Sequence, residues 1–240
     1  METIEIDYGG TNFSIEIIRK QIKNVYLKVY PDGTIKISAN YEVSYDFLKN
    51  YIVEKRYWIY KKLRAFQDFS IEVSTKSYVS GEAVRYLGKQ YRLKIFEDKM
   101  DNVKWFRGYI HIYTKKVDNT KYKQKLYEEW LRKKAHQITI EIINDELNKL
   151  SRFNIHRPEI TLRKMKSRWG SYIPKNNSVT LNTELIKTPK QCIEYVIVHE
   201  LLHLIFPNHS KDFYNLLAIK MPDWKQRKKI LDEEFGRITL

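Results

Sequence analysis

The sequence predicts an α+β protein with a β-rich N-terminal part that contains one long helix, followed by a mainly helical C-terminal part. Short segments in which apolar and polar residues alternate dominate the first half, as is typical of half-buried strands. Longer segments repeat apolar residues at helical spacing, starting near Ser44 and Tyr122. The stretch from 114 to 121 is polar and charged, so we expect a β-rich module at 1–115 and a second domain at 116–240.

The N-terminal module has six recognisable elements. Alternating residues predict strands at 13–17 and 25–29, and the turn Pro31-Asp-Gly33 leads into a third strand at 34–38. Apolar residues then recur along one side from 44 to 66, which predicts a helix with a serine cap. Two β-hairpins follow at 86–95 and 103–112, because each places a glycine in a short turn between alternating residues. No cluster of catalytic residue types occurs in this module.

The C-terminal domain is predicted to begin with a long helix at 122–147. Strands at 159–166 and 178–182 follow, and the turn residues between them predict that these two strands pair as a hairpin. An apolar helix begins near Thr188, and a short helix at 211–219 precedes a basic C-terminal helix.

The helix after Thr188 carries the motif His199-Glu-Leu-Leu-His203. Residues i and i+4 lie on the same side of a helix, so His199 and His203 can bind one ion while Glu200 reaches a water held by it. The helix is otherwise apolar nearly all round, and burying these side chains without partners would cost a few kcal/mol. The motif therefore predicts the site of a zinc hydrolase.

Tetrahedral zinc in such a site needs a third protein ligand and leaves the fourth position to water. His209 is the candidate, because the residues between His203 and His209 predict a helix end and a turn that returns the chain to the site. A glutamate of the last helix, Glu233 or Glu234, is the alternative third ligand.

The formal net charge of +15 predicts attraction to an anionic partner such as nucleic acid, a nucleotide or an acidic protein. Basic residues cluster, for example, at 121–125 and 225–229. The alternative is an ordinary solvated surface, and charge alone does not decide. Arg163, Lys166 and Arg168 lie along and just after a predicted strand, so they are candidates to bind substrate, including phosphate groups.

Several classes of protein are disfavoured. No apolar run approaches the ~18 residues that would span a bilayer, and residues 1–7 carry acids where a secretory signal needs basic residues. The single cysteine, Cys192, cannot form an internal disulfide, so we expect a reducing, cytoplasmic setting and no membrane partner. His111, His136 and His156 lack metal-ligand spacing and are expected to be surface or packed histidines.

Motifs throughout the chain, the most specific of them in its last third, match those of one known family. They are Val25-Tyr-Leu-Lys-Val29, Tyr86-Leu-Gly88, Lys166-Ser-Arg-Trp-Gly-Ser171, Val179-Thr-Leu-Asn182, His199-Glu-Leu-Leu-His203 and Asn208-His-Ser210 with Phe213. In these motifs the chain resembles the YgjP-like zinc metallopeptidase family of the zincin and SprT-like group. Tyr172 departs from the family pattern, where Cys is frequent, and Tyr214 departs where Trp is common.

The resemblance implies a zincin-like metallopeptidase domain with His199, His203 and His209 as zinc ligands and Glu200 as general base. On this interpretation the strand at 159–166 supports a peptide or protein substrate. Arg168, Tyr172 and Tyr214 are candidates to stabilise the oxyanion.

Two other functions stay open at this point. Some members of the family are described as nucleotide pyrophosphatases, so the same site with its arginine and lysine cluster predicts, as an alternative, hydrolysis of nucleoside triphosphates. The second alternative is a basic nucleic-acid-associated protein whose metal is not catalytic.

Overall fold

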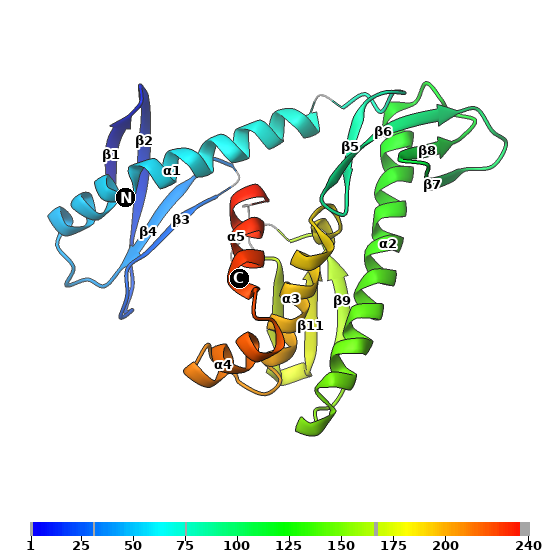
Figure 1. Cartoon of the computed structure of the whole chain (residues 1–240). Coiled ribbons are helices and arrows are strands. Elements are labelled where there is room, and N and C mark those ends of the chain that lie inside the picture. Colours follow the sequence, from blue (N-terminus) through cyan, green and yellow to red (C-terminus); the bar gives the residue numbers. More distant parts are fainter. Residues whose placement is uncertain (1, 31, 75, 166–167, 236–240) are drawn as a thin grey trace. The chain divides into compact units, whose positions relative to one another are not determined.

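The computed structural model confirms the α+β class (Figure 1). It describes residues 2–30, 32–74, 76–165 and 168–235. Within these residues the strands form three sheets and there are five α-helices. The chain divides into two compact units, Met1–Thr75 and Lys76–Leu240.

The first unit is a four-stranded sheet with one helix. The elements are β1 (Glu2–Tyr8), β2 (Thr11–Arg19), β3 (Tyr26–Val29), β4 (Ile35–Ala39) and α1 (Tyr45–Ser74). The strand order is β1-β2-β4-β3, with β2 and β4 parallel and the other pairs antiparallel. Alternate strand residues, such as Ile15 and Ile37, are buried together with Leu48 and Ile52 of α1. Ser44 caps α1 as predicted, since its Oγ accepts from the N–H of Phe47.

The second unit begins with a separate four-stranded sheet of order β5-β6-β8-β7. Its strands are β5 (Ala83–Tyr86), β6 (Lys89–Phe96), β7 (Asn102–Phe106) and β8 (Tyr109–Tyr113). The two predicted hairpins are present as the antiparallel pairs β5–β6 and β7–β8. Strands β6 and β8, one from each hairpin, are joined in parallel.

A long helix, α2 (Thr120–Lys149), leads from this sheet to a three-stranded sheet of order β10-β11-β9. Its strands are β9 (Glu159–Arg163), β10 (Gly170–Ile173) and β11 (Ser178–Asn182). The predicted hairpin of 159–166 with 178–182 is not formed, because β9 and β11 are parallel neighbours. The antiparallel partner of β11 is β10, which arises within the connection between them.

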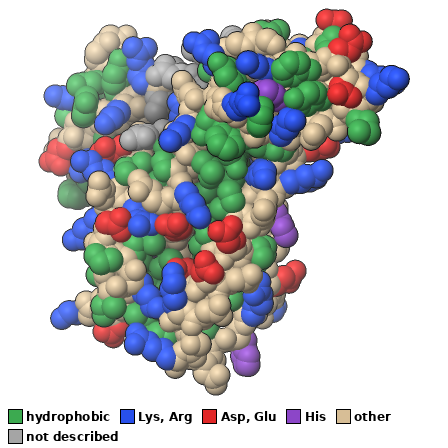
Figure 2. Space-filling view, turned by 45° about the vertical axis from the view of Figure 1, so that its right-hand side comes forward, with side chains coloured by type: hydrophobic (Ala, Val, Ile, Leu, Met, Phe, Trp, Pro, Cys, Tyr) green, Lys and Arg blue, Asp and Glu red, His purple; other side chains and the backbone are tan. Residues whose placement is uncertain are grey.

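Three helices complete the second unit: α3 (Lys190–Leu202), α4 (Lys211–Lys220) and α5 (Trp224–Glu234). Short 3-10 turns at Ser151–Phe153, Pro174–Asn176 and Thr183–Lys187 join the elements. None of the described helices is both long and apolar enough to cross a membrane. Lysine and arginine side chains are scattered over the face of the molecule that Figure 2 shows.

The compact units divide at a different place from the predicted boundary at 115/116. That boundary lies inside the second unit, where the polar stretch is the connection from β8 to α2: Asn119 caps this helix by accepting from the N–H of Tyr122. Residues of the β5–β8 sheet, such as Tyr86 and Ile110, share one core with Trp130 of α2. The polar composition of this stretch therefore marks the approach to a helix cap and not a boundary between domains, because one core includes residues on both sides of the stretch.

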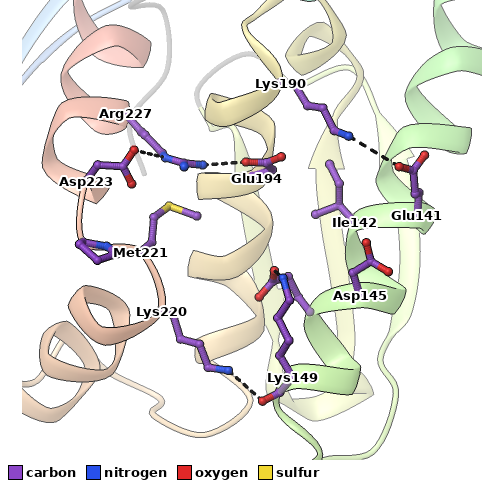
Figure 3. Close-up of a pocket in the computed structure, with 12 residues that line it drawn as sticks. Glu141, Ile142, Asp145, Lys149, Lys190, Glu194, Lys220, Met221, Asp223 and Arg227 are labelled. Carbon is purple, nitrogen blue, oxygen red and sulfur yellow. Dashed lines mark hydrogen bonds and ion pairs between the residues drawn. The ribbon is translucent and has the colours of Figure 1, made fainter.

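Charged contacts fix α3 against α2 and α5. The guanidinium of Arg227 on α5 donates to Glu194 of α3 at 2.7 Å and to Asp223 at 2.9 Å. Lys190 of α3 pairs with Glu141 of α2 at 3.6 Å. Figure 3 shows these side chains around a hollow of about 270 Å³ between the three helices. None of the predicted metal ligands lines it, so we assign these contacts to the positioning of α3.

We expect Arg227→Met to lower the free energy of unfolding by about 1–3 kcal/mol, because the change leaves Glu194 and the carbonyl of Gln191 without their charged donor. Urea unfolding of the full chain measures this loss. In the control, Lys125→Met breaks an exposed 3.9 Å pair with Glu129 and should cost less than about 0.5 kcal/mol. Equal losses in the two variants would show that Arg227 has no special part in holding α3.

Candidate metal centre

The central element of the site is α3, which is buried along almost its whole length. From Tyr195 to Leu202 every residue is buried. His199 and Glu200 lie within this segment, with only 5% and 3% of their surface exposed. Apolar residues flank both, so the helix is held in the core by burial and carries two polar groups with it. Such groups need partners within the protein or a bound ion.

The three predicted ligands come together. One nitrogen of each of His199, His203 and His209 lies within 4.8 Å of the other two. The Nε2 atoms of His199 and His209 are 2.9 Å apart. Of the described residues, this group of three histidines is the one that has the arrangement of a metal site.

The chain between α3 and α4 explains how His209 reaches the site. After α3 ends, the N–H of Phe206 donates to the carbonyl of Leu202, which closes a turn. Ser210 then caps α4 by accepting from the N–H of Phe213 at 3.3 Å. The turn and the cap return His209 to the end of α3. Glu233, the alternative ligand, is exposed on α5 and outside the group, whereas the side chain of Glu234 lies outside the described residues.

A hydrogen bond sets the orientation of His203. Its Nδ1 lies 3.0 Å from the carbonyl oxygen of Phe206. A carbonyl can only accept, so Nδ1 carries the proton and Nε2 is left with a free lone pair. A backbone carbonyl behind the ring is the usual way in which a metal-binding imidazole is fixed.

The electrostatics favour the neutral forms of His199 and His209. Burial lowers the pKa of His199 to about 3, and the neighbouring His203 and His209 act in the same direction. Burial and His203 also lower the pKa of His209. The Nδ1 atom of His199 is buried and has no hydrogen-bond partner among the described residues. Three imidazoles with converging nitrogens are a donor set that fits a divalent transition metal.

One buried aromatic ring supports all three histidines. Phe213 is fully buried, and its ring centroid lies 5.0 Å from that of His199 and 4.9 Å from those of His203 and His209. Tyr214, the next residue, stacks on His209 with 6.0 Å between centroids. The packing limits rotation of the imidazoles and so holds their nitrogens together.

Strand β10 contacts the carboxylate of Glu200. A Cβ added at Gly170 would lie 2.7 Å from Cγ and 2.9 Å from Cδ of Glu200. Burial raises the pKa of Glu200 to about 7, whereas the N–H of Tyr172, which donates to the carboxylate, and the charge of Arg168 lower it. Glu200 is thus enclosed by α3 on one side and by the backbone of β10 on the other.

The structure assigns the predicted substrate-binding residues that it describes to different strands. Arg168 lies just before β10, and its charge acts on Glu200. Arg163 ends β9, on the opposite edge of the three-stranded sheet from β10. Lys166 lies outside the described residues. The predicted platform strand is therefore not the strand that contacts Glu200, because β11 lies between β9 and β10.

Three functional features escaped the sequence reasoning. They are the N–H of Tyr172, the missing side chain at Gly170 and the support that Phe213 gives to the histidines. The hydroxyl of Tyr172, a candidate for the oxyanion, instead lies 3.3 Å from Asn177. A glycine in a strand can indicate a close approach, but the sequence does not name the partner.

Comparison with known proteins identifies the class. The sequence model of the family described as YgjP-like, metallopeptidase domain, matches residues 23–234, so the chain belongs to the YgjP-like metallopeptidase family. A family of metallopeptidase domains consists of metal-dependent hydrolases, and the predicted recognition is confirmed.

One solved structure among those that match is the metallopeptidase zymogen jannalysin of Methanocaldococcus jannaschii. It shares 24% identity with this chain over 40% of this chain and 88% of that one, with a TM-score of 0.36. No curated protein matches the sequence.

We expect added Zn²⁺ to stabilise the metal-free protein by about 2.7 kcal/mol when free zinc is about 100 times its Kd, because the folded chain alone presents the three imidazoles together. In His209→Ala the gain should fall below about 1 kcal/mol at the same zinc concentration. Thermal unfolding with and without zinc measures both values. The controls are His136→Ala, which removes an exposed histidine of α2, and Glu233→Ala. A gain kept by His209→Ala and lost by Glu233→Ala would reverse the choice of third ligand.

Gly170→Ala should reduce the rate at which the zinc-loaded chain hydrolyses an unstructured protein such as casein about 100-fold, while zinc binding is unchanged. The new Cβ displaces the Glu200 carboxylate and touches none of the histidines among its nearest neighbours. Zinc stoichiometry and melting temperature are measured beside the rate to separate this effect from unfolding. Full activity in this variant would mean that the position of Glu200 against β10 is unimportant.

Proposed function

We propose that the chain is a zinc-dependent metallopeptidase in which His199, His203 and His209 hold the zinc and Glu200 is the general base. The observation that carries this proposal is the convergence of three imidazole nitrogens within 4.8 Å beside a carboxylate on the same buried helix. Membership of a metallopeptidase family supports a peptide or protein as substrate.

The proposed roles follow from the donor set and its surroundings. When bound, zinc supplies a Lewis acid and lowers the pKa of a coordinated water to about 7. Glu200 takes a proton at its carboxylate and passes it to the leaving amine. The N–H of Tyr172 and the charge of Arg168 keep this carboxylate oriented and favour its ionised form. Arg168 and Tyr214 are the remaining candidates to stabilise the oxyanion.

Strand β10 is the proposed platform for an extended substrate, in place of the strand at 159–166. It is an edge strand of its sheet and pairs with β11 on one side only. An edge strand offers unpaired N–H and C=O groups to which an extended peptide can add. Because β10 also contacts Glu200, a peptide paired with it lies next to the proposed base.

The geometry gives less support to the two alternatives. Of the cationic residues that a phosphate clamp would use, Arg168 acts on Glu200, whereas Arg163 ends the strand at the other edge of the sheet. A purely structural zinc would need four protein ligands, and the group among the described residues offers three. Three protein ligands leave the fourth coordination position of the zinc to water, as a zinc hydrolase requires.

Hydrolysis by the zinc-loaded chain tests the proposal against both alternatives. The substrates are an unstructured protein such as casein and a panel of nucleoside triphosphates, each incubated with the unmodified chain and with Glu200→Gln. We expect cleavage of protein alone, and a loss of about 10²- to 10⁴-fold in Glu200→Gln, which removes the base and keeps the shape of the side chain. Zinc stoichiometry should stay at one per chain in both.

Two results would contradict the proposal. Cleavage of triphosphates that disappears in Glu200→Gln would establish the pyrophosphatase. Cleavage of neither substrate class with one zinc bound per chain would favour a metal that is not catalytic.

A further inference from the structure

The β5–β8 sheet has a second face that points away from its core. In β8, Ile110 and Ile112 are fully buried in the core, so by alternation Tyr109, His111 and Tyr113 lie on the opposite face. The register of the sheet places further residues beside these three on the same face. They are Arg92, Lys94 and Phe96 of β6, and Asn102, Lys104 and Phe106 of β7. We call these nine residues the outer face.

Aromatic rings surround the histidine at the centre of the outer face. The ring centroids of Phe96, Phe106, Tyr109 and Tyr113 lie 5.2, 5.8, 6.4 and 6.1 Å from that of His111. Phe96 and Tyr113 are also stacked on one another. Phe96 remains 39% exposed and Phe106 46% exposed. The face is thus an aromatic surface with ring area open to solvent.

Cationic groups lie over these rings. The Nζ of Lys94 is 3.9 Å from the ring centroid of Tyr109, and that of Lys104 is 4.9 Å from the centroid of Tyr113. Arg107, in the turn after β7, lies over Phe106 at 5.1 Å. Each cation lies beside a ring, and none of the three has an ion pair with an acid within the part of the chain that the structure describes. Burial and the two lysines lower the pKa of His111, so its ring is neutral at neutral pH.

None of the nine positions of the outer face carries an acid. The acids of this sheet that are nearest in sequence, Glu97, Asp98 and Asp101, lie in the connection between β6 and β7. Asp101 is engaged there by the hydroxyl of Tyr122 at 2.6 Å. In the upper right part of Figure 2, green side chains alternate with blue ones, and red side chains are seen toward the outer end of the view. The outer face is therefore positive and aromatic at once.

We propose that the outer face of the β5–β8 sheet binds single-stranded nucleic acid, with bases stacked on its exposed rings and phosphates contacting its lysines and arginines. Unpaired bases offer flat π surfaces to aromatic side chains, and the phosphates between them match the cations. A duplex keeps its bases stacked inside, so it would use the cations and leave the rings without a role. An acidic peptide would likewise use the charges alone.

The proposal is independent of the proposed peptidase function, because none of the nine residues belongs to the candidate metal centre. It also differs from an attraction based on net charge. The basic clusters that stand out in the sequence, such as 225–229 on α5, contribute no residue to this face. The two sources of affinity can therefore be separated by variants that change the charge equally.

The test measures binding of the full chain to a fluorescent oligothymidylate of about twenty nucleotides by anisotropy. One double variant, Lys94→Glu with Lys104→Glu, reverses the charge of the two lysines of the outer face. The matched double variant, Lys225→Glu with Lys229→Glu, makes the same change in net charge at two exposed lysines of α5. We expect the first to weaken binding at least about tenfold and the second less than about threefold.

An aromatic series tests stacking separately from charge. Phe106→Ala should weaken binding about 5- to 100-fold, and Phe106→Tyr should restore most of the affinity because it keeps a ring. Tyr41→Ala, which removes a tyrosine that is 69% exposed in the first unit, should leave binding unchanged. Circular dichroism and the melting temperature of each variant show whether it is folded. If Phe106→Ala does not fold, the comparison of the two lysine double variants tests the proposal.

Three results would overturn the proposal. Equal losses in the two lysine pairs would show attraction by net charge alone. Tighter binding of a duplex of the same sequence, or of polyglutamate, would assign the face to a different partner. If the unmodified chain does not bind the oligothymidylate at low salt, nucleic acid is excluded as the partner of this face.

Discussion

The burial of α3 is the constraint on which the second unit depends. A helix that is apolar on nearly every side carries His199 and Glu200 into the core, where each must find a partner. The surrounding elements supply these partners from different parts of the chain. The segment after α3 returns His209 to His199, and the backbone of β10 donates to Glu200. The candidate metal centre is thus the place where the Nε2 of His199 and the carboxylate of Glu200 meet their partners, while the buried Nδ1 of His199 has none among the described residues.

The order of strands in the small sheet determines which backbone faces the site. Because β11 pairs in parallel with β9 and antiparallel with β10, the strand nearest Glu200 is the short one that begins at Gly170. The absence of a side chain at this glycine lets the strand and the carboxylate approach one another. The same arrangement puts Arg163 on the strand at the other edge, whereas the charge of Arg168 acts on Glu200.

Positive charge in this protein takes two forms. Runs of lysine and arginine along the helices are visible in the sequence and give the chain its net charge of +15. The outer face of the β5–β8 sheet gathers fewer cations, two from β6 and one from β7, and places aromatic rings between them. Net charge acts at long range and without selectivity, whereas a face that combines rings and cations can distinguish between nucleic-acid structures.

The sequence by itself determined the α+β class, the hairpins of the β5–β8 sheet and the spacing of His199 and His203, because each depends on residues close together in the chain. It also supplied the family through the motifs of its last third. Tertiary structure decided what depends on distant residues. Tyr86 and Trp130 share one core, so the boundary between the units differs from the predicted one. Strand β11 pairs antiparallel with β10 and not with the predicted partner. Phe213 and Tyr172 belong to the site through contacts that no local pattern encodes. Alternation along one strand predicts which residues share a face, but the outer face exists only because register brings three strands together.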